Sequence, residues 1–176
     1  MAERRVKLQD TGEIVPKSKS GIYQAPNKKY YSSEDAYLAL DLENSNRDKC
    51  IDMMYDFMGY SEKQKLSTFF YKKLSEWHEG YSYAVIDMAM GLSADAINYS
   101  NRCKSFCNET AKLNYFMAII QNNLNDALKI GETLRKKVMK ASKAGNLDAM
   151  IDGLESLNNI STTKKGADVS SLVGDL

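Results

Sequence analysis

The segment Leu113-Asn-Tyr-Phe-Met-Ala-Ile-Ile-Gln-Asn-Asn-Leu124 decides the fold of this chain. Apolar residues recur in it every three or four positions, and the pattern continues to residue 128, at positions 113, 116, 117, 120, 124, 127 and 128. This period is typical of an amphipathic helix that faces a core. Tyr115 and Ile119 fall on a neighbouring face, so we expect the first half of this helix to be buried on more than one side.

Two further helices are predicted before this segment. Residues 68–79 carry Phe69, Phe70, Leu74 and Trp77 and end at Gly80. The next helix begins after Ser82, runs to about Asn101, and carries Val85, Ile86, Ala89, Met90 and Ile97. Residues 102–108 then form a connection, and Asn108 or Thr110 caps the long helix because both side chains can accept hydrogen bonds from free backbone amides.

The helical part of the chain starts at Ser32-Ser33-Glu34-Asp35, where serine caps a helix and two acids favour its first turn. This helix carries Ala36, Leu38, Ala39, Leu40 and Leu42. Asn44-Ser45-Asn46 either breaks it or lies on its solvated face. A helical pattern resumes at Cys50 and ends at Gly59.

Residues 1–32 differ in composition from the rest. Asp10-Thr-Gly12 separates two short β-prone runs, Val6–Leu8 and Glu13–Val15, and a second turn is expected at 26–29. Seven bases against three acids give this segment a net charge of +4. We predict a small β-hairpin arm whose charge is solvated.

The long helix is expected to continue beyond residue 128 through Ile130, Leu134 and Val138 to Lys143, and to end at Gly145. A last amphipathic helix is predicted at 146–157, and residues 158–176 are expected to be a disordered tail. The predicted organisation is therefore an arm (1–32), a helical domain (33–157) and a tail (158–176).

The predicted fold class is mainly α: a compact helical bundle with a small N-terminal β-hairpin, a long basic helix and a disordered C-terminal tail. The composition, with 43% hydrophobic and 27% charged residues, is that of an ordinary globular domain. The net charge of +1 demands neither nucleic acid nor membrane as a partner of the whole chain. No run of residues reaches the length of a membrane span, and we expect a cytoplasmic protein.

The sequence contains no catalytic motif, and we expect neither an enzyme nor a cofactor. His78 is the only histidine, and Cys50, Cys103 and Cys107 are too scattered to predict a metal site. Asp87 and Asp95 could share one helix face, and we interpret both as solvated surface.

Positive charge concentrates in residues 129–143. Lys129, Arg135, Lys136, Lys137, Lys140 and Lys143 stand against one acid, Glu132, for a net charge of +5. Such a stretch can follow a phosphate backbone, although it also suits a helix C-terminus and solubility. Aromatic residues near lysines, such as Tyr115 near Lys112, could add a stacking surface for single strands.

The block Phe69–Leu128 resembles the C-terminal module of the DnaD/DnaB-like replication-initiation family of Gram-positive bacteria and their phages. That module has a helix with the spacing Tyr-x3-Ile-x3-Trp, and here Tyr115 and Ile119 match while Asn123 replaces the tryptophan. The resemblance implies DNA binding and helicase loading. It assigns DNA contacts to Tyr115, Ile119 and the basic stretch 129–143.

Two functions follow as expectations. The first is a phage or mobile-element replication accessory protein that binds DNA, preferably single-stranded, and a replisome protein. The second is a phage-encoded inhibitor of a host enzyme, such as a defence nuclease, acting by protein–protein binding. A homo-oligomer built on the long helix is a third, weaker expectation.

Overall fold

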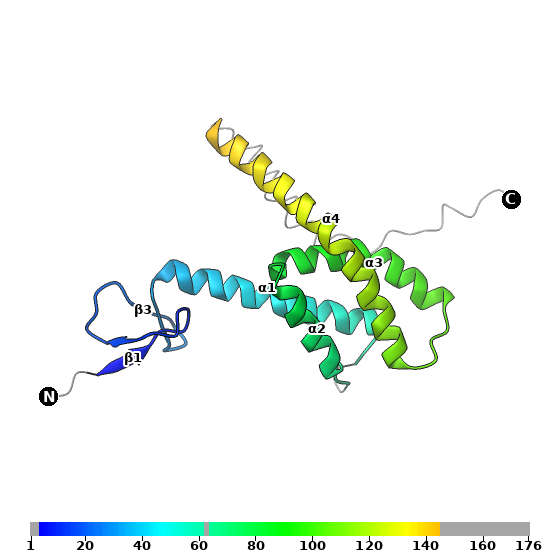
Figure 1. The fold of residues 1–176 in the computed structure, drawn as a ribbon, viewed down its shortest axis with the longest axis horizontal. Helices are drawn as coiled ribbons and strands as arrows, with labels where there is room; N and C mark the ends of the chain where they lie inside the picture. Colours follow the sequence, from blue (N-terminus) through cyan, green and yellow to red (C-terminus); the bar gives the residue numbers. More distant parts are fainter. Residues whose placement is uncertain (1–3, 62–63, 145–176) are drawn as a thin grey trace. The chain divides into compact units, whose positions relative to one another are not determined.

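The computed structural model describes residues 4–61 and 64–144. It is mainly helical, as predicted, with two short β-hairpins before four helices (Figure 1). The strands are β1 (Arg5–Lys7), β2 (Ile14–Pro16), β3 (Tyr23–Gln24) and β4 (Tyr30–Tyr31). The helices are α1 (Glu34–Met58), α2 (Thr68–His78), α3 (Tyr83–Cys103) and α4 (Glu109–Lys143). The predicted helix at 146–157 and the predicted tail lie outside the described residues.

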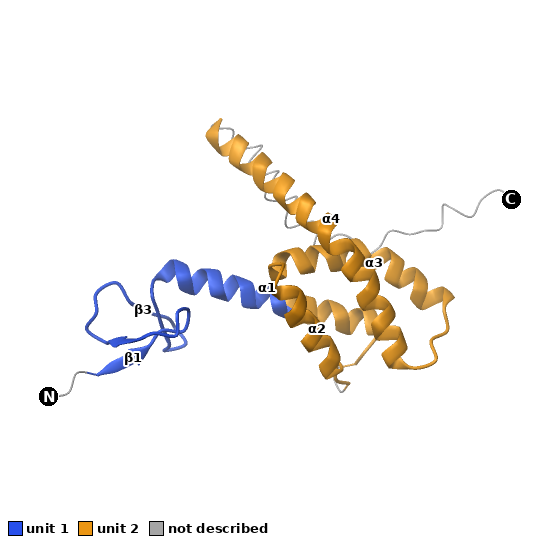
Figure 2. Ribbon diagram, in the orientation of Figure 1, with its two compact units in different colours: residues 1–48 blue, residues 49–176 orange. Residues whose placement is uncertain are grey.

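The chain divides into two compact units, residues 1–48 and 49–176 (Figure 2). This division falls inside α1 and not at residue 32, where the composition changes. Aromatic packing explains the difference, because Tyr37 of α1 contacts Tyr23 and Tyr31 of the hairpins, with ring centroids 5.6 and 5.1 Å apart. The first turns of α1 therefore belong to the N-terminal unit.

The N-terminal unit is built on the two turns that the sequence predicts. β1 and β2 pair antiparallel around the Asp10–Gly12 turn, and Gly12 adopts φ +76°, a conformation that glycine tolerates well. Val6, Leu8 and Val15 form a small core beneath Ile22 and Tyr30. The Asp10 carboxylate accepts hydrogen bonds from the backbone amide and the hydroxyl of Ser32, and the hydroxyl bond holds the pKa of Asp10 below its usual value.

Helix α1 is continuous through Asn44-Ser45-Asn46, so these residues do not break it. Ser33 caps its N-terminus, where its hydroxyl accepts a hydrogen bond from the Ala36 amide at 3.1 Å. Leu38 and Leu42, one turn apart near the start of α1, are 54% and 62% exposed. This part of the helix therefore presents apolar side chains to solvent.

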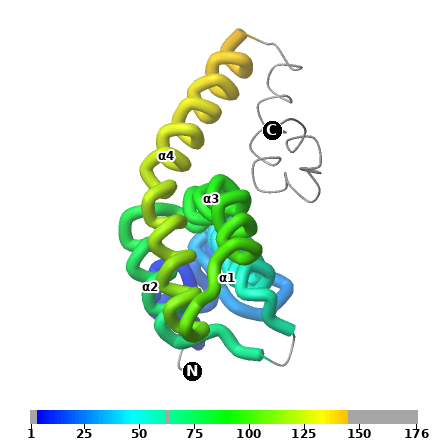
Figure 3. Tube along the Cα trace, turned by 90° about the vertical axis from the view of Figure 1, so that its right-hand side faces the viewer, coloured from blue at the N-terminus to red at the C-terminus, as the bar shows by residue number. Residues whose placement is uncertain are grey.

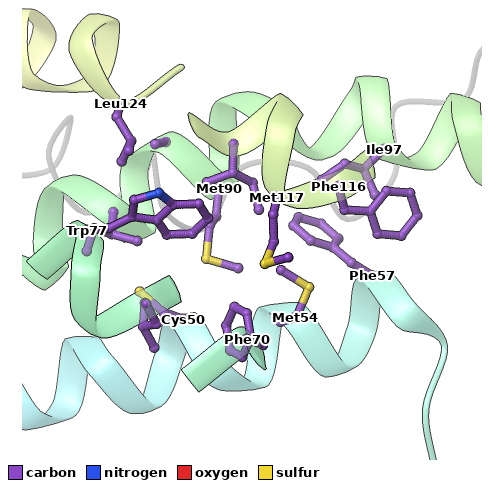
Figure 4. Close-up of a cluster of buried hydrophobic side chains, with 14 of the residues drawn as sticks. Cys50, Met54, Phe57, Phe70, Trp77, Met90, Ile97, Phe116, Met117 and Leu124 are labelled. Atoms are coloured by element: carbon purple, nitrogen blue, oxygen red, sulfur yellow. The ribbon is translucent and has the colours of Figure 1, made fainter. Parts of the chain in front are cut away.

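The core of the second unit lies between the second half of α1 and helices α2, α3 and α4 (Figure 4). The most extensive packing is that of α3 against α4. All four helices contribute large, fully buried side chains to this core, among them Met54, Phe70, Ile86, Met90, Ile97, Phe116 and Ile120. All six residues from Val85 to Met90 of α3 are buried, so this segment has no exposed face.

Polar contacts fix the ends of these helices. The Asn108 side chain accepts from the Ala111 amide at 2.8 Å, so Asn108 and not Thr110 caps α4. Asn101 Nδ2 donates to the Phe57 carbonyl at 2.9 Å and the Tyr60 hydroxyl donates to Glu109 at 2.9 Å. These bonds connect the end of α1 to α3 and α4.

Helix α4 continues through Gly131, although glycine is a poor helix former. A Cβ atom added to this residue would meet nothing within 4 Å. We therefore predict that Gly131→Ala raises the free energy of unfolding by about 0.5–1 kcal/mol, because alanine is the better helix former. Urea denaturation followed by circular dichroism measures this change.

The matched control is Gly59→Ala. Gly59 has φ +70°, which an alanine adopts only with strain, so this variant should be less stable than the parent chain. A lower free energy of unfolding in Gly131→Ala would contradict the prediction, since it would show that a Cβ atom at this position is unfavourable.

Candidate nucleic-acid interface

The nine residues predicted to bind nucleic acid all lie on α4, but the structure separates them into two groups. Lys112, Tyr115 and Ile119 lie in the first turns, within the bundle. The six bases lie between 129 and 143, in the second half of α4, whose last turns extend beyond α2 and α3 (Figures 1 and 3). Tyr115 and Lys136 are about 31 Å apart along the axis at a rise of ~1.5 Å per residue, so the two groups do not form one site.

The first group is engaged inside the bundle. Lys112 Nζ donates to the Met58 carbonyl at 3.0 Å and lies 5.6 Å from the centre of the Phe116 ring. Ile119 is half-buried against the core. These contacts give both residues structural roles.

Tyr115 is held by Lys104. Lys104 Nζ donates to the Tyr115 hydroxyl at 2.6 Å and lies 4.1 Å from the ring centre. The hydrogen bond from this ammonium group, followed by one with Ser100, lowers the pKa of Tyr115. Phe106 packs against the same ring with centroids 5.7 Å apart, so little of the ring is free to stack on a base.

Asn123, at the position of the tryptophan in the DnaD-like spacing, is also structural. Its Nδ2 donates to the hydroxyl of Ser93 at 2.9 Å and to the Ile119 carbonyl at 3.3 Å. Ser93 is fully buried on α3 and donates to the Ala89 carbonyl at 2.7 Å. This polar pair joins α3 to α4 where the spacing has an aromatic side chain.

The second group forms a basic surface that also contains the exposed acid Glu132. All six bases are exposed, and Lys129 pairs with Asp126 at 3.2 Å. Within residues 4–61 and 64–144, no ion pair involves any of the other five. Lys129, Lys136 and Lys143 are seven residues apart and share one face, with Lys140 beside them. Since a helix rises ~1.5 Å per residue, these charges are spread over about 21 Å.

Asp87 corrects one prediction. The sequence suggested solvated surface, but Asp87 is 4% exposed, whereas Asp95 is exposed. Burial raises the pKa of Asp87 to about 6, and the nearby charge of Lys49 opposes that shift. Among the described residues, Asp87 Oδ1 has no hydrogen-bond partner. The apolar residues around Asp87, in the run Val85-Ile-Asp-Met-Ala-Met90, were the feature of the sequence that could have indicated its burial.

The described residues offer no metal site. They contain no group of three or more histidine, cysteine or acidic side chains that could hold an ion. Cys50 is buried, while Cys103 and Cys107 are exposed. His78 stacks on Tyr83 with ring centroids 3.9 Å apart.

No helix in the described parts of the chain has the length and apolar character that crossing a membrane requires. The fold and the site thus define a mainly helical protein with one projecting basic helix. The chain belongs to the family of SPbeta prophage protein YorH, whose family model matches residues 10–171. The expectation of a phage protein is thereby confirmed. Neither the curated proteins nor the solved structures contain a match.

The raised pKa of Asp87 predicts a pH dependence of stability. Between about pH 4 and pH 6 the folded state holds a proton that the unfolded state has lost, so the free energy of unfolding falls as pH rises through this window. The loss is at most about 3 kcal/mol, at 1.36 kcal/mol per pKa unit. Asp87→Asn should remove this component, which urea denaturation at pH 4 and pH 7 measures.

Asp95→Asn is the control, because Asp95 is exposed on the same helix. The difference in stability between pH 4 and pH 7 should match that of the parent chain in this control. An unchanged pH dependence in Asp87→Asn would contradict the effect of burial on this carboxyl group.

Proposed function

We propose that this phage protein is a non-enzymatic DNA-binding accessory protein that holds nucleic acid along the basic face of α4. One observation carries the proposal: Lys129, Lys136, Lys140 and Lys143 lie on an exposed surface of a helix that extends beyond its own bundle. The single acid in this stretch, Glu132, does not offset the charge.

The mechanism is electrostatic. Lysines spread over about 21 Å can contact successive phosphates and release counterions, and such binding tolerates any sequence. Tyr115 and Lys112 contribute by fixing the base of α4 in the bundle, because both side chains have partners there. This differs from the aromatic stacking expected from the sequence, and it favours backbone tracking.

A role in replication rests on the resemblance of Phe69–Leu128 to the DnaD/DnaB-like module. Tyr115 and Ile119 carry that resemblance, and the family of prophage proteins is compatible with it. In this proposal the helical bundle contacts a replisome protein while α4 holds DNA, preferably single-stranded.

A salt titration tests DNA binding. We predict measurable affinity for a labelled single-stranded or duplex oligonucleotide at low ionic strength, with log K falling linearly against log salt. Lys136→Ala combined with Lys140→Ala removes two phosphate contacts. The slope should become shallower by about 1.4 for single strands or about 1.8 for duplex. Fluorescence anisotropy measures both slopes.

The control combines Lys65→Ala with Lys72→Ala, which removes two exposed lysines outside α4. Its slope should equal that of the parent chain. If neither DNA form binds at low salt, the DNA-binding proposal is wrong.

A second candidate is a protein that binds and inhibits a host enzyme, such as a defence nuclease. The observation that favours it is the apolar surface of α1, where Leu38 and Leu42 are more than half exposed. In this case, Leu38→Ser with Leu42→Ser would abolish capture of the host protein, whereas Lys136→Ala with Lys140→Ala would have no effect.

A further inference from the structure

The N-terminal unit carries a second concentration of positive charge. Between residues 4 and 32, seven bases stand against two acids, Asp10 and Glu13, which gives a net charge of +5. All seven bases are exposed: Arg4, Arg5, Lys7, Lys17, Lys19, Lys28 and Lys29. In the parts of the chain that the structure describes, no ion pair involves any of them. This charge is therefore available to a negatively charged partner.

The pleat of the first hairpin, β1 with β2, divides its side chains between two faces. Val6 pairs with Val15, and both are buried in the small core of this unit. Because successive side chains of a strand point to opposite sides, Arg5 and Lys7 lie on the other face together with Ile14. We call this the outer face of the hairpin, and it consists of Arg5, Lys7, Ile14 and Pro16.

Neither of the two acids lies on the outer face. The Leu8 amide donates to the Glu13 carbonyl at 2.8 Å, so the antiparallel pairing continues beyond the strands. The alternation then places Glu13 on the same face as Val15. Asp10 lies in the turn, where its carboxylate accepts hydrogen bonds from Ser32. The only charged side chains of the outer face are therefore cations.

An exposed isoleucine lies beside these cations. Ile14 is paired with Lys7 across the hairpin and is 64% exposed. A large apolar side chain is unfavourable in water, so the chain gains free energy when a partner covers it. Cations attract phosphates, and an apolar group suits a base edge such as the methyl group of thymine. The outer face combines both kinds of contact.

We propose that the outer face of the β1–β2 hairpin binds duplex DNA in the major groove. That groove is about 12 Å wide and admits a two-stranded β-ribbon, whose strands lie ~4.8 Å apart. Arg5 and Lys7 contact the phosphates that border the groove, and Ile14 contacts base edges inside it. The major groove of duplex RNA is deep and narrow, so it does not admit side chains in this way.

This surface is separate from the basic face of α4, because it belongs to the other compact unit of the chain. The proposal therefore stands whether or not α4 binds DNA. With both surfaces, one chain can hold two segments of nucleic acid at once, which the basic face of α4 does not provide by itself.

The test uses the full chain in a background that removes charge from α4. Alanine replaces four exposed lysines in this α4 variant: Lys129, Lys136, Lys140 and Lys143. At low ionic strength, fluorescence anisotropy should still show binding of the α4 variant to a labelled DNA duplex. No binding of the duplex by this variant would overturn the proposal. The DNA-binding proposal for α4 would remain if the parent chain bound the same duplex.

Substitutions on the outer face then locate the contact. Arg5→Ala with Lys7→Ala, added to the α4 variant, removes two phosphate contacts. The slope of log K against log salt should become shallower by about 1.8. Ile14→Ser should weaken binding at every salt concentration and leave the slope unchanged, because it removes an apolar contact and no charge.

The matched control is Arg4→Ala with Lys17→Ala in the same background. It also removes one arginine and one lysine from this hairpin, but from the other face. The Lys17 amide donates to the Arg4 carbonyl at 2.8 Å, and Lys17 Nζ lies 5.9 Å from the centre of the Tyr30 ring, which packs on the core. The slope of the control should equal that of the α4 variant. Equal changes in both double substitutions would overturn the proposal, since neither face would be preferred.

A comparison of nucleic acids tests the groove. A duplex RNA of the same sequence and a single strand of the same DNA should both bind the α4 variant more weakly than the DNA duplex does. Equal or tighter binding of either would contradict insertion into the major groove.

A further measurement uses the unsubstituted chain, in case the variants fold poorly. Addition of the DNA duplex should shift the amide resonances of residues 5–16 in nuclear magnetic resonance spectra of the parent chain. Shifts confined to residues of α4 would contradict the proposal.

Discussion

The packing of α4 against α3 is the interaction on which the rest of the structure depends. Phe116 and Ile120 of α4 and Met90 and Ile97 of α3 are fully buried, and α1 and α2 add Met54 and Phe70 to the same core (Figure 4). Removing a side chain of this size from a core costs several kcal/mol, which is a large part of the stability of a small domain. The same contact fixes the direction in which the second half of α4 leaves the bundle.

Helix α4 therefore combines two roles along one axis. Its first turns are structural, and polar contacts of Lys112, Tyr115 and Asn123 reinforce the apolar packing. Its last turns carry the concentrated charge. Since one rigid element carries both, the position of the basic face is set by the core and not by a flexible tail. This is the physical basis of the DNA-binding proposal for this chain.

Much of this fold could be predicted from the sequence because the signals are local. Asn108 and Ser33 cap helices, Gly12 permits a turn, and the 3.6-residue period of 113–128 places the core face of α4. Asn44-Ser45-Asn46 could not be decided in this way, because the polar run fits both a break and a solvated helix face. The boundary at residue 48 depends on tertiary contacts of Tyr37 that no local pattern contains.

The candidate site was predictable only in part. Composition alone identifies the basic stretch 129–143. The engagement of Tyr115 by Lys104 and Phe106 depends on the connection between α3 and α4, and the burial of Asp87 depends on which helices surround α3. Tyrosine and aspartate are both common on protein surfaces. The contacts of Tyr115 and the burial of Asp87 could therefore not be predicted without the tertiary structure.

The central claim is that α4 is one continuous helix that joins the core to the basic face. Spin labels at Ala118 and Lys136, two exposed positions, test it by double electron–electron resonance in a chain without Cys103 and Cys107. The labels are eighteen residues apart, which is five helical turns, so a continuous helix predicts a narrow distribution of backbone separations near 27 Å at ~1.5 Å per residue. A broad distribution, or a markedly shorter mean distance, would show that the helix bends or ends near Gly131 and would contradict the account.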